Sequence, residues 1–317
     1  MNEKITEITN RILDDPSDTI SNDMLIDLTD LLIESEVYVP VDGDEIALYR
    51  WGPGTYIPIS CDLDDFKKAF KDESHVITRF EHLEDFLTRD VSGFIINPGG
   101  RIFILSKYLS RLAFNKNRPK AKVTEGYDVK VRLNDFRPLT WRDLIIPDNM
   151  TFMELDDVLK TLWGFNGEHL SCFLLKKSNQ WIMDDDLANE TMMGMDYNAN
   201  STYVSEIFDS YDKITYWYDF GDDWQFDIEI KKKIDYDKDY VTIKRFKGKY
   251  DPIEDCGGVY GLSEIVYYAQ HPDEEDYDDF SELVEYLEEF DIEFTQLTLE
   301  RKVYVKSQWH RDVYFDE

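Results

Sequence analysis

One basic, proline-containing run constrains the organisation of the whole chain. It covers residues 115–122, reads NKNRPKAK, and interrupts a 317-residue chain whose net charge is −32. Regular hydrophobic patterns stop before it and resume after it, which is typical of a linker. We therefore predict a first domain at residues 1–114, a basic linker at 115–124, and a second domain at 125–317 that ends in acidic helices.

The charge balance excludes several classes of partner. The chain has 67 acidic and 35 basic residues, whereas nucleic-acid binding depends on lysine and arginine releasing counterions from phosphates. Direct binding to nucleic acid or to an acidic membrane surface is therefore disfavoured. A protein partner with a basic surface, cations, or solubility alone are the interpretations that this charge leaves open.

The N-terminus and the cysteines indicate where the protein works. No apolar run reaches the roughly 18 residues that a membrane span needs, and the N-terminal residues lack an apolar signal core. The three cysteines, Cys61, Cys172 and Cys256, are far apart and odd in number, so neither a disulfide framework nor a zinc pair is indicated. We expect a cytoplasmic protein without membrane contact.

The first half has helical spacing at its start and strand-like alternation afterwards. We predict helices at residues 5–13, 25–32, 63–70 and 83–87 and from Ser106, and strands at 36–41, 56–59, 93–96 and 101–105. A turn, NPGG, joins the last two strands. His75 and His82 lie in a polar stretch without a matched partner and are expected on the surface.

The second half mixes the two periodicities in the same way. We predict strands at residues 127–133, 144–147, 168–173, 214–218 and 224–230, and helices at 152–162, from Leu262 and at 279–290. Thr151 and Glu154 have the spacing of a capping box. Residues 178–200 are expected to form a long loop. The fold class that follows is α+β, with two domains that each pack helices on a small mixed or antiparallel sheet.

The first half resembles the SseB-like N-terminal domain family over about residues 25–112. The resemblance rests on residues 32–41, which end in EVYVPV, on YIPI at 56–59 followed by LDDFKKAF at 63–70, and on GFIINPGGRIFILS at 93–106. It implies a fold rather than an activity, because no catalytic set accompanies these motifs.

The second half resembles the plasmid pRiA4b ORF-3-like family over about residues 127–290. Four motifs occur in order: PLTWR at 138–142, Glu168-His169-Leu170 with Phe173, YDFGDDW at 218–224, and EDCGG at 254–258. The family is also known as the "TnpR" passenger protein of a mobile element. That label implies a resolvase, but the acidic chain lacks the arginine-rich setting that a serine recombinase needs.

The chain departs from the pattern of that family at two positions. Asp143 stands where the family usually has a second arginine after the Trp-Arg pair, and Phe226 stands where it often has a histidine. A role of that histidine as ligand or base does not carry over to this chain.

The motifs define a candidate ligand pocket. Its residues are Trp141, Arg142, His169, Asp219, Asp222, Trp224, Glu254, Asp255 and Cys256. Trp141 is expected to supply an aromatic platform, Arg142 a cation paired with Asp219 or Glu254, and His169 a base or ligand. The sequence indicates no cofactor, although carboxylates grouped in this way can bind a divalent cation.

A purely structural interpretation of the same residues stays open. Aspartates in a hairpin turn commonly cap their own backbone, tryptophans commonly fill cores, and a buried Arg–Asp pair can simply fix strand geometry. Cys256 alone is more typical of a small buried apolar group than of a nucleophile.

Three functions are compatible with the sequence. The first is an accessory or interaction protein that binds a protein, or a small polar ligand, through the Trp-Arg, YDFGDDW and EDCGG motifs. The second is a metal-assisted hydrolase or transferase that uses His169, Asp219, Asp222, Glu254 and Cys256. The third is a DNA mimic whose carboxylates imitate phosphates. The first is favoured, because no complete catalytic set is visible.

Overall fold

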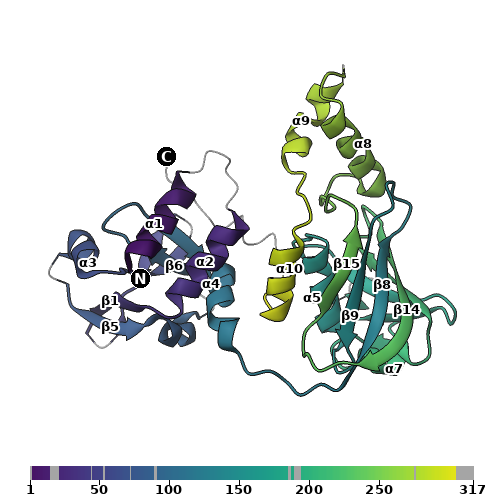
Figure 1. Ribbon diagram of the computed structural model, residues 1–317, viewed down its shortest axis with the longest axis horizontal. Coiled ribbons are helices and arrows are strands. Elements are labelled where there is room, and N and C mark those ends of the chain that lie inside the picture. Colours follow the sequence, from purple (N-terminus) through teal and green to yellow (C-terminus); the bar gives the residue numbers. More distant parts are fainter. Residues whose placement is uncertain are drawn as a thin grey trace. The chain divides into compact units, whose positions relative to one another are not determined.

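The protein consists of two compact units that divide along the chain between Arg118 and Pro119. The computed structural model describes residues 2–14, 21–43, 45–52, 54–71, 73–88, 91–184, 187–188, 194–274 and 276–304 (Figure 1). Both units combine helices with β-sheets, which confirms the predicted α+β class. Among the described residues, no helix is both long and apolar enough to cross a membrane.

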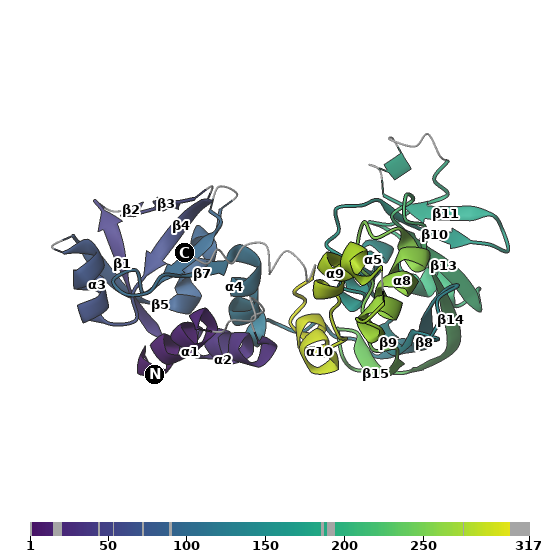
Figure 2. The same ribbon diagram turned by 90° about the horizontal axis from the view of Figure 1, so that it is seen from above.

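The first unit holds two small sheets and their helices. Its elements are α1 (Asn2–Leu13), α2 (Asn22–Leu32), β1 (Glu36–Asp42), β2 (Glu45–Ile46), β3 (Tyr49–Trp51), β4 (Gly54–Ile59), α3 (Leu63–Phe70), β5 (His75–Arg79), the 3₁₀ helix η1 (Phe80–Phe86), β6 (Gly93–Ile96), β7 (Phe103–Ser106), α4 (Lys107–Phe114) and the 3₁₀ helix η2 (Asn115–Asn117). The sheets have the strand orders β2-β1-β5 and β3-β4-β6-β7. Helix α2 contacts both α1 and α4 (Figure 2).

Most elements of the first unit follow from local sequence signals. The side chain of Asp62 caps α3 by accepting from the backbone N–H of Asp65 at 2.8 Å, and Ser106 caps α4 in the same way. The helix expected at 83–87 is instead the longer 3₁₀ helix η1. The short strands β2 and β3 were not predicted, because two or three residues carry too little alternation to detect. Strand β5 was not predicted either, and its five residues show no alternation between buried and exposed positions. His75 is exposed, as expected, although it lies on β5 with its ring 4.7 Å from that of Phe66.

The second unit is built on one eight-stranded sheet. Its elements are β8 (Glu125–Leu133), β9 (Trp141–Pro147), α5 (Phe152–Leu162), β10 (Ser171–Leu175), β11 (Gln180–Met183), β12 (Tyr197–Asn198), α7 (Val204–Phe208), β13 (Lys213–Tyr218), β14 (Trp224–Asp235), β15 (Thr242–Lys247), α8 (Gly258–Gln270), α9 (Tyr277–Glu285) and α10 (Ile292–Glu300). The strand order is β12-β11-β10-β13-β14-β8-β9-β15, and all neighbours except β11 and β12 are antiparallel.

One face of this sheet carries the core and the other carries charge. Helix α5 buries Phe152, Leu155 and Leu159 against the inner face, and the predicted Thr151–Glu154 capping box at its start is confirmed. The outer face presents ionic side chains such as Arg132 and Asp227, which lie opposite each other on β8 and β14. The alternation of the long central strands therefore separates an apolar side from a charged side.

Several predicted boundaries in the second unit move, and one of these shifts matters for function. Strand β10 begins at Ser171 rather than at Glu168, so His169 lies on a loop. The loop expected at 178–200 contains β11 and β12, although its residues 185–186 and 189–193 lie outside the described residues. Helix α8 begins at Gly258 rather than Leu262, and α9 ends at Glu285 rather than at Phe290. Strand β15 and helices α7 and α10 were not predicted.

Candidate functional site

Two loops of the second unit lie against each other and carry most of the motif residues. One follows α5 at residues 163–170, the other precedes α8 at 251–257, and we call the pair the seam. The backbone N–H of Asn166 donates to Glu254 Oε1 at 3.1 Å. A Cβ built on Gly164, whose φ is +74°, would lie 3.3 Å from the Cβ of Asp251. The two loops are therefore packed together along their length.

One end of the seam is closed around Arg142. This side chain is 0% exposed, and its guanidinium donates to Asp251 Oδ1 at 3.2 Å and to the Lys247 carbonyl oxygen at 3.0 Å. The ring centroid of Phe290 lies 3.7 Å from the guanidinium carbon, and that of Trp163 lies 4.6 Å away. Burial lowers the pKa of Arg142 to about 10, while the charge of Asp251 opposes that shift, so the cation persists at neutral pH.

The ion pair expected for Arg142 is wrong. Neither Asp219 nor Glu254 is its partner, because Asp251, three residues before Glu254, occupies the guanidinium. Trp141, the neighbouring residue on β9, points to the outer face of the sheet, where Lys130 Nζ lies 4.1 Å from its ring centroid. Strand alternation separates this Trp-Arg pair onto opposite faces, so the two cannot line one pocket.

The middle of the seam is a hydrogen-bonded pair of acidic groups. The Tyr218 hydroxyl donates to Glu254 Oε1 and accepts from the backbone N–H of His169 at 3.4 Å. Burial raises the pKa of Glu254, and the hydrogen bonds from Tyr218 and Asn166 only partly offset this effect. Burial and the same carboxylate raise the pKa of Tyr218. This pair ties the hairpin strand β13 to both loops of the seam.

The other end of the seam is open and contains His169. Its Nε2 lies 3.4 Å from Asp255 Oδ1, and its Nδ1 lies 3.7 Å from Asp219 Oδ2. The side chain of Asp255 is 78% exposed, that of His169 is 28% exposed and that of Asp219 is 9% exposed. One potential ligand atom from each of the three residues lies within 4.8 Å of the others. We call these three residues the histidine cluster.

The YDFGDDW turn orients Asp219 toward the histidine. Asp219 has φ +52°, and its Oδ1 accepts from the backbone N–H groups of Gly221 at 2.9 Å and Asp222 at 3.3 Å. The carboxylate caps its own turn through one oxygen and presents the other to His169. Asp222 lies in the same turn, and its Oδ2 is buried with no hydrogen-bond partner among the described residues.

The EDCGG loop packs tightly on that turn. A Cβ on Gly258, whose φ is +67°, would lie 2.0 Å from the Asp222 carbonyl oxygen, and one on Gly261 would lie 1.7 Å from that of Cys256. Only glycine fits at either position. Burial and the charge of Asp222 raise the pKa of the Cys256 thiol to about 12, so this cysteine is protonated at neutral pH and is a poor nucleophile.

The remaining motif residues have structural surroundings. Trp224 is 0% exposed, with its ring centroid 5.9 Å from that of Phe165. Phe226 is equally buried and packs 4.7 Å from Trp163, which suits an apolar side chain where the family often has histidine. Asp143 is buried on the outer face and accepts from Lys231 at 2.8 Å and Arg245 at 2.6 Å, so an acid fits there.

The structure thus brings some candidate residues together and separates others. His169, Asp219 and Asp255 meet at the open end, with Glu254, Asp222 and Cys256 beside them on the same turns. Trp141, Arg142 and Trp224 lie elsewhere. Sequence reasoning missed Asp251, Tyr218 and Asn166 as partners. Asp251 is one of several acids near EDCGG and nothing marks it out, and a backbone donor such as Asn166 leaves no signal in the sequence.

Comparisons with known proteins give a family match within the second unit and two further similarities. A family model described as plasmid pRiA4b ORF-3-like protein matches residues 125–298. An uncharacterized protein, y4hQ, of Sinorhizobium fredii is 24% identical over 145 residues, which are 45% of this chain and 73% of that protein. A crystal structure of a protein of unknown function, MM3350 from Methanosarcina mazei Go1, has 23% identity and a TM-score of 0.42, over 50% of this chain and 88% of that one.

Proposed function

The chain belongs to the plasmid pRiA4b ORF-3-like protein family, and we propose that its family domain is a binding domain that holds a divalent metal ion at the histidine cluster. One observation carries this proposal: His169, Asp219 and Asp255 come from three separate loops, yet one potential ligand atom of each lies within 4.8 Å of the others. Two acids and an imidazole converging in this way form a donor set for a cation.

The donor chemistry favours a zinc-like ion over calcium or magnesium. Imidazole nitrogen and carboxylate oxygen both bind Zn²⁺ at about 2.0–2.2 Å, whereas Ca²⁺ takes six to eight oxygen ligands. Tetrahedral bonds of that length separate ligand atoms by roughly 3.4 Å, and His169 Nε2 already lies 3.4 Å from Asp255 Oδ1. Three protein ligands leave a fourth position for water or for a polar ligand.

Asp219 has two possible duties, which experiment separates. If Nε2 of His169 binds the metal, its Nδ1–H faces Asp219 Oδ2 at 3.7 Å and can donate to that carboxylate when the site tightens. Asp219 then orients the imidazole rather than binding the ion. If Asp219 instead binds the ion, Asp219→Asn removes a carboxylate ligand. If Asp219 only orients the imidazole, Asp219→Asn retains an acceptor and lowers the metal affinity less.

The test is a zinc titration of the full chain after chelator treatment and dialysis. We expect one site, an affinity that falls at least tenfold in His169→Ala and in Asp255→Asn, and unchanged binding in His271→Ala and Asp273→Asn. These controls are an exposed histidine and an exposed aspartate outside the cluster. Equal binding by all five proteins, or no binding by the unaltered chain, would refute the proposal.

The same site gives the hydrolase or transferase alternative a narrower form. A metal with an open position can activate water, while the raised pKa of Cys256 makes water the better-supported nucleophile. Hydrolysis of an ester substrate that depends on added zinc and is lost in His169→Ala would favour this alternative. Metal binding without turnover favours a binding role, which we consider the better supported.

A second candidate function, binding of a basic protein, rests on an acidic arm formed by α8 and α9. From Asp251 to Glu300 the chain has 17 acidic residues and no lysine or arginine. The two helices project beyond the end of the sheet (Figure 1), and α9 buries none of its described side chains. Tyr260 and Tyr286 on the arm are 75% and 63% exposed. Exposed tyrosines amid acids suit a lysine- or arginine-rich surface.

A lysine-rich peptide tests this candidate. We expect salt-sensitive binding that is lost in a variant with Asp278, Asp279 and Glu282 changed to Lys, and retained when exposed acids of the first unit are reversed instead. If the arm variant binds the peptide as well as the unaltered protein does, the acidic arm is not the binding surface. A DNA mimic is one form of this function, and competition between the protein and DNA for a basic DNA-binding protein would identify it.

For the remainder of the chain we propose the organisation that its motifs imply. Residues 1–114 would be an SseB-like domain, 115–124 a linker, and the protein a cytoplasmic accessory factor. The support is the order of the N-terminal motifs and the basic composition of the linker. Brief trypsin treatment should cut first between Lys116 and Lys122 and release two folded fragments; early cuts inside either unit would contradict this organisation.

A further inference from the structure

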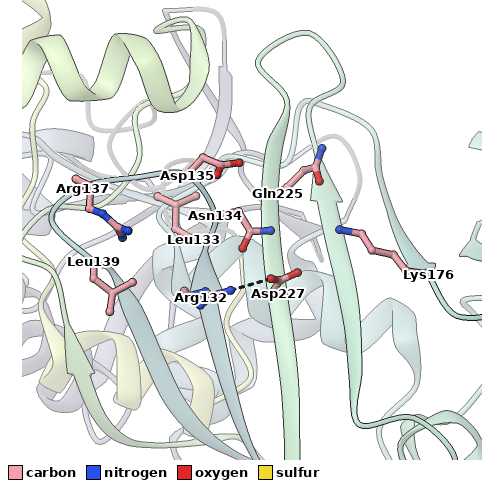
Figure 3. A pocket seen from close by; sticks show the side chains of 9 residues that line it. All are labelled: Arg132, Leu133, Asn134, Asp135, Arg137, Leu139, Lys176, Gln225 and Asp227. Carbon is pink, nitrogen blue, oxygen red and sulfur yellow. Dashed lines mark hydrogen bonds and ion pairs between the residues drawn. The ribbon is translucent and has the colours of Figure 1, made fainter.

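The outer face of the eight-stranded sheet contains a hollow that neither the histidine cluster nor the acidic arm uses. The hollow has a volume of about 470 Å³ and lies where the end of β8, the β8–β9 loop, the start of β14 and the turn after β10 come together (Figure 3). Three cations line it, one from each of three segments: Arg132, Arg137 and Lys176. In a chain with net charge −32, such a grouping of bases requires a reason.

The buried acid in the wall of the hollow is already neutralised. Asp227 Oδ2 accepts from Arg132 at 3.0 Å and from Lys213 at 2.5 Å, and its Oδ1 accepts from Thr215 at 3.1 Å. Burial raises the pKa of Asp227, but hydrogen bonds from Lys213 and Asn134 outweigh this and leave the pKa lowered. Two cations on one carboxylate give this wall a net positive charge.

The other two cations remain available to a ligand. Arg137 and Lys176 are both exposed, and neither forms a hydrogen bond or ion pair with another residue in the described part of the chain. Figure 3 shows Arg137 on one side of the hollow and Lys176 on the other, with Asn134 and the Arg132–Asp227 pair between them. Asp135 also lines the hollow, and its negative charge is not neutralised by another of the lining residues.

We infer that this hollow binds a small phosphate monoester. A guanidinium fork such as that of Arg137 matches two phosphate oxygens, and Lys176 adds a second positive charge on the other side of the hollow. Arg132, held by Asp227, adds positive potential without moving. A volume of about 470 Å³ exceeds what inorganic phosphate fills and lies within the range of metabolite sites, so the ester's organic part also fits, against Leu139.

The experiment is calorimetric titration of the full chain, freed of metal by chelator, at low ionic strength. The probes are AMP and glucose 6-phosphate, with adenosine and glucose as neutral counterparts, and succinate as a carboxylate. We expect both phosphate esters to bind, both neutral compounds to fail, and succinate to bind at least tenfold more weakly. Equal binding of succinate, or binding of adenosine equal to AMP, would overturn the assignment of a phosphate ligand.

Variants locate the site and separate it from the histidine cluster. Arg137→Gln with Lys176→Gln should weaken AMP at least tenfold, whereas Lys177→Gln should change it less than twofold, because Lys177 points to Asp212 at 3.0 Å instead. His169→Ala should bind AMP normally. Loss of AMP binding in His169→Ala, or normal binding in the double variant with an unchanged melting temperature, would sink the inference. All substituted cations are exposed, so the variants should fold.

Discussion

Arg142 and His169 lie at opposite ends of the same seam, and their surroundings differ in almost every respect. Arg142 is 0% exposed, its acid partner Asp251 is buried, and aromatic rings cover the guanidinium. His169 is partly exposed, and its two carboxylate neighbours stand 3.4 and 3.7 Å away, beyond good hydrogen-bond geometry. Both residues come from motifs, yet Arg142 is enclosed by protein, whereas His169 lies beside two carboxylates at a partly exposed position.

Residues of the motifs therefore have structural roles at the closed end and are candidates for ligand binding at the open end. At the closed end, Arg142 and Asp251 hold a loop of the seam against the sheet. In the middle of the seam, the hydrogen bond between Tyr218 and Glu254 joins the hairpin to the loops. These contacts fix the backbone that carries His169 at the open end. Substitutions at the closed end should act on folding, and those at the open end should act on ligand affinity.

The largest effect is expected at the closed end. Arg142→Ala removes the buried cation that pairs with Asp251, and breaking a buried pair in this way costs about 3–5 kcal/mol. Urea unfolding of the second unit measures the loss. Arg245→Ala, which removes a 67% exposed partner of Asp143, is the matched control and should cost far less. A loss below about 1 kcal/mol for Arg142→Ala would contradict a scaffold role.

The contact between the two turns should come next in size. Gly258→Ala places a Cβ against the Asp222 carbonyl oxygen, so the loop must move. The substitution also puts a side chain at a φ of +67°, and we expect it to destabilise the protein by about 2 kcal/mol. Zinc affinity should fall with it, since Asp255 shifts. Gly194→Ala has open space around its Cβ and serves as control. Unchanged zinc affinity in a destabilised Gly258→Ala would separate the loop from the site.

The middle of the seam predicts a pH dependence. Burial raises the pKa of Glu254 above its usual 4.5, so as pH rises the unfolded chain ionises first and stability is lost. Glu254→Gln, which keeps an acceptor for Tyr218 and Asn166, should therefore gain stability relative to the unaltered protein as pH rises from 4 to 7. A difference between the two proteins that does not change with pH would show that the carboxyl is not held in this way.

The smallest effect concerns Cys256, which the sequence suggested as a buried apolar group rather than a nucleophile. The pKa of the Cys256 thiol is raised to about 12 by burial and by Asp222, so iodoacetamide should label it slowly at neutral pH. Asp222→Asn removes part of that cause and should speed the labelling modestly. Rapid labelling of Cys256 in the unaltered protein would return it to the catalytic candidates.

Local signals predicted the regular elements of the fold, and distant contacts decided the site. The Thr151–Glu154 box and the alternation of β13 and β14 depend on neighbouring residues, so both were readable. Arg142 instead pairs with Asp251, more than a hundred residues away, and nothing in the sequence distinguishes that acid from Asp219 or Glu254. Strand β10 begins at Ser171, so His169 lies on a loop. The reason is that pairing with β13 ends at Tyr218, and Asp219 begins the hairpin turn.

The decisive measurement for a metal site at the histidine cluster is anomalous scattering at the zinc edge from zinc-soaked crystals of the unaltered chain. We expect one strong peak at about 2.0–2.2 Å from His169 Nε2 and from a carboxylate oxygen of Asp255, with Asp219 either binding or facing Nδ1. A peak only elsewhere on the acidic surface, or His169 closed onto its two aspartates with no metal between them, would contradict a metal site at the open end of the seam.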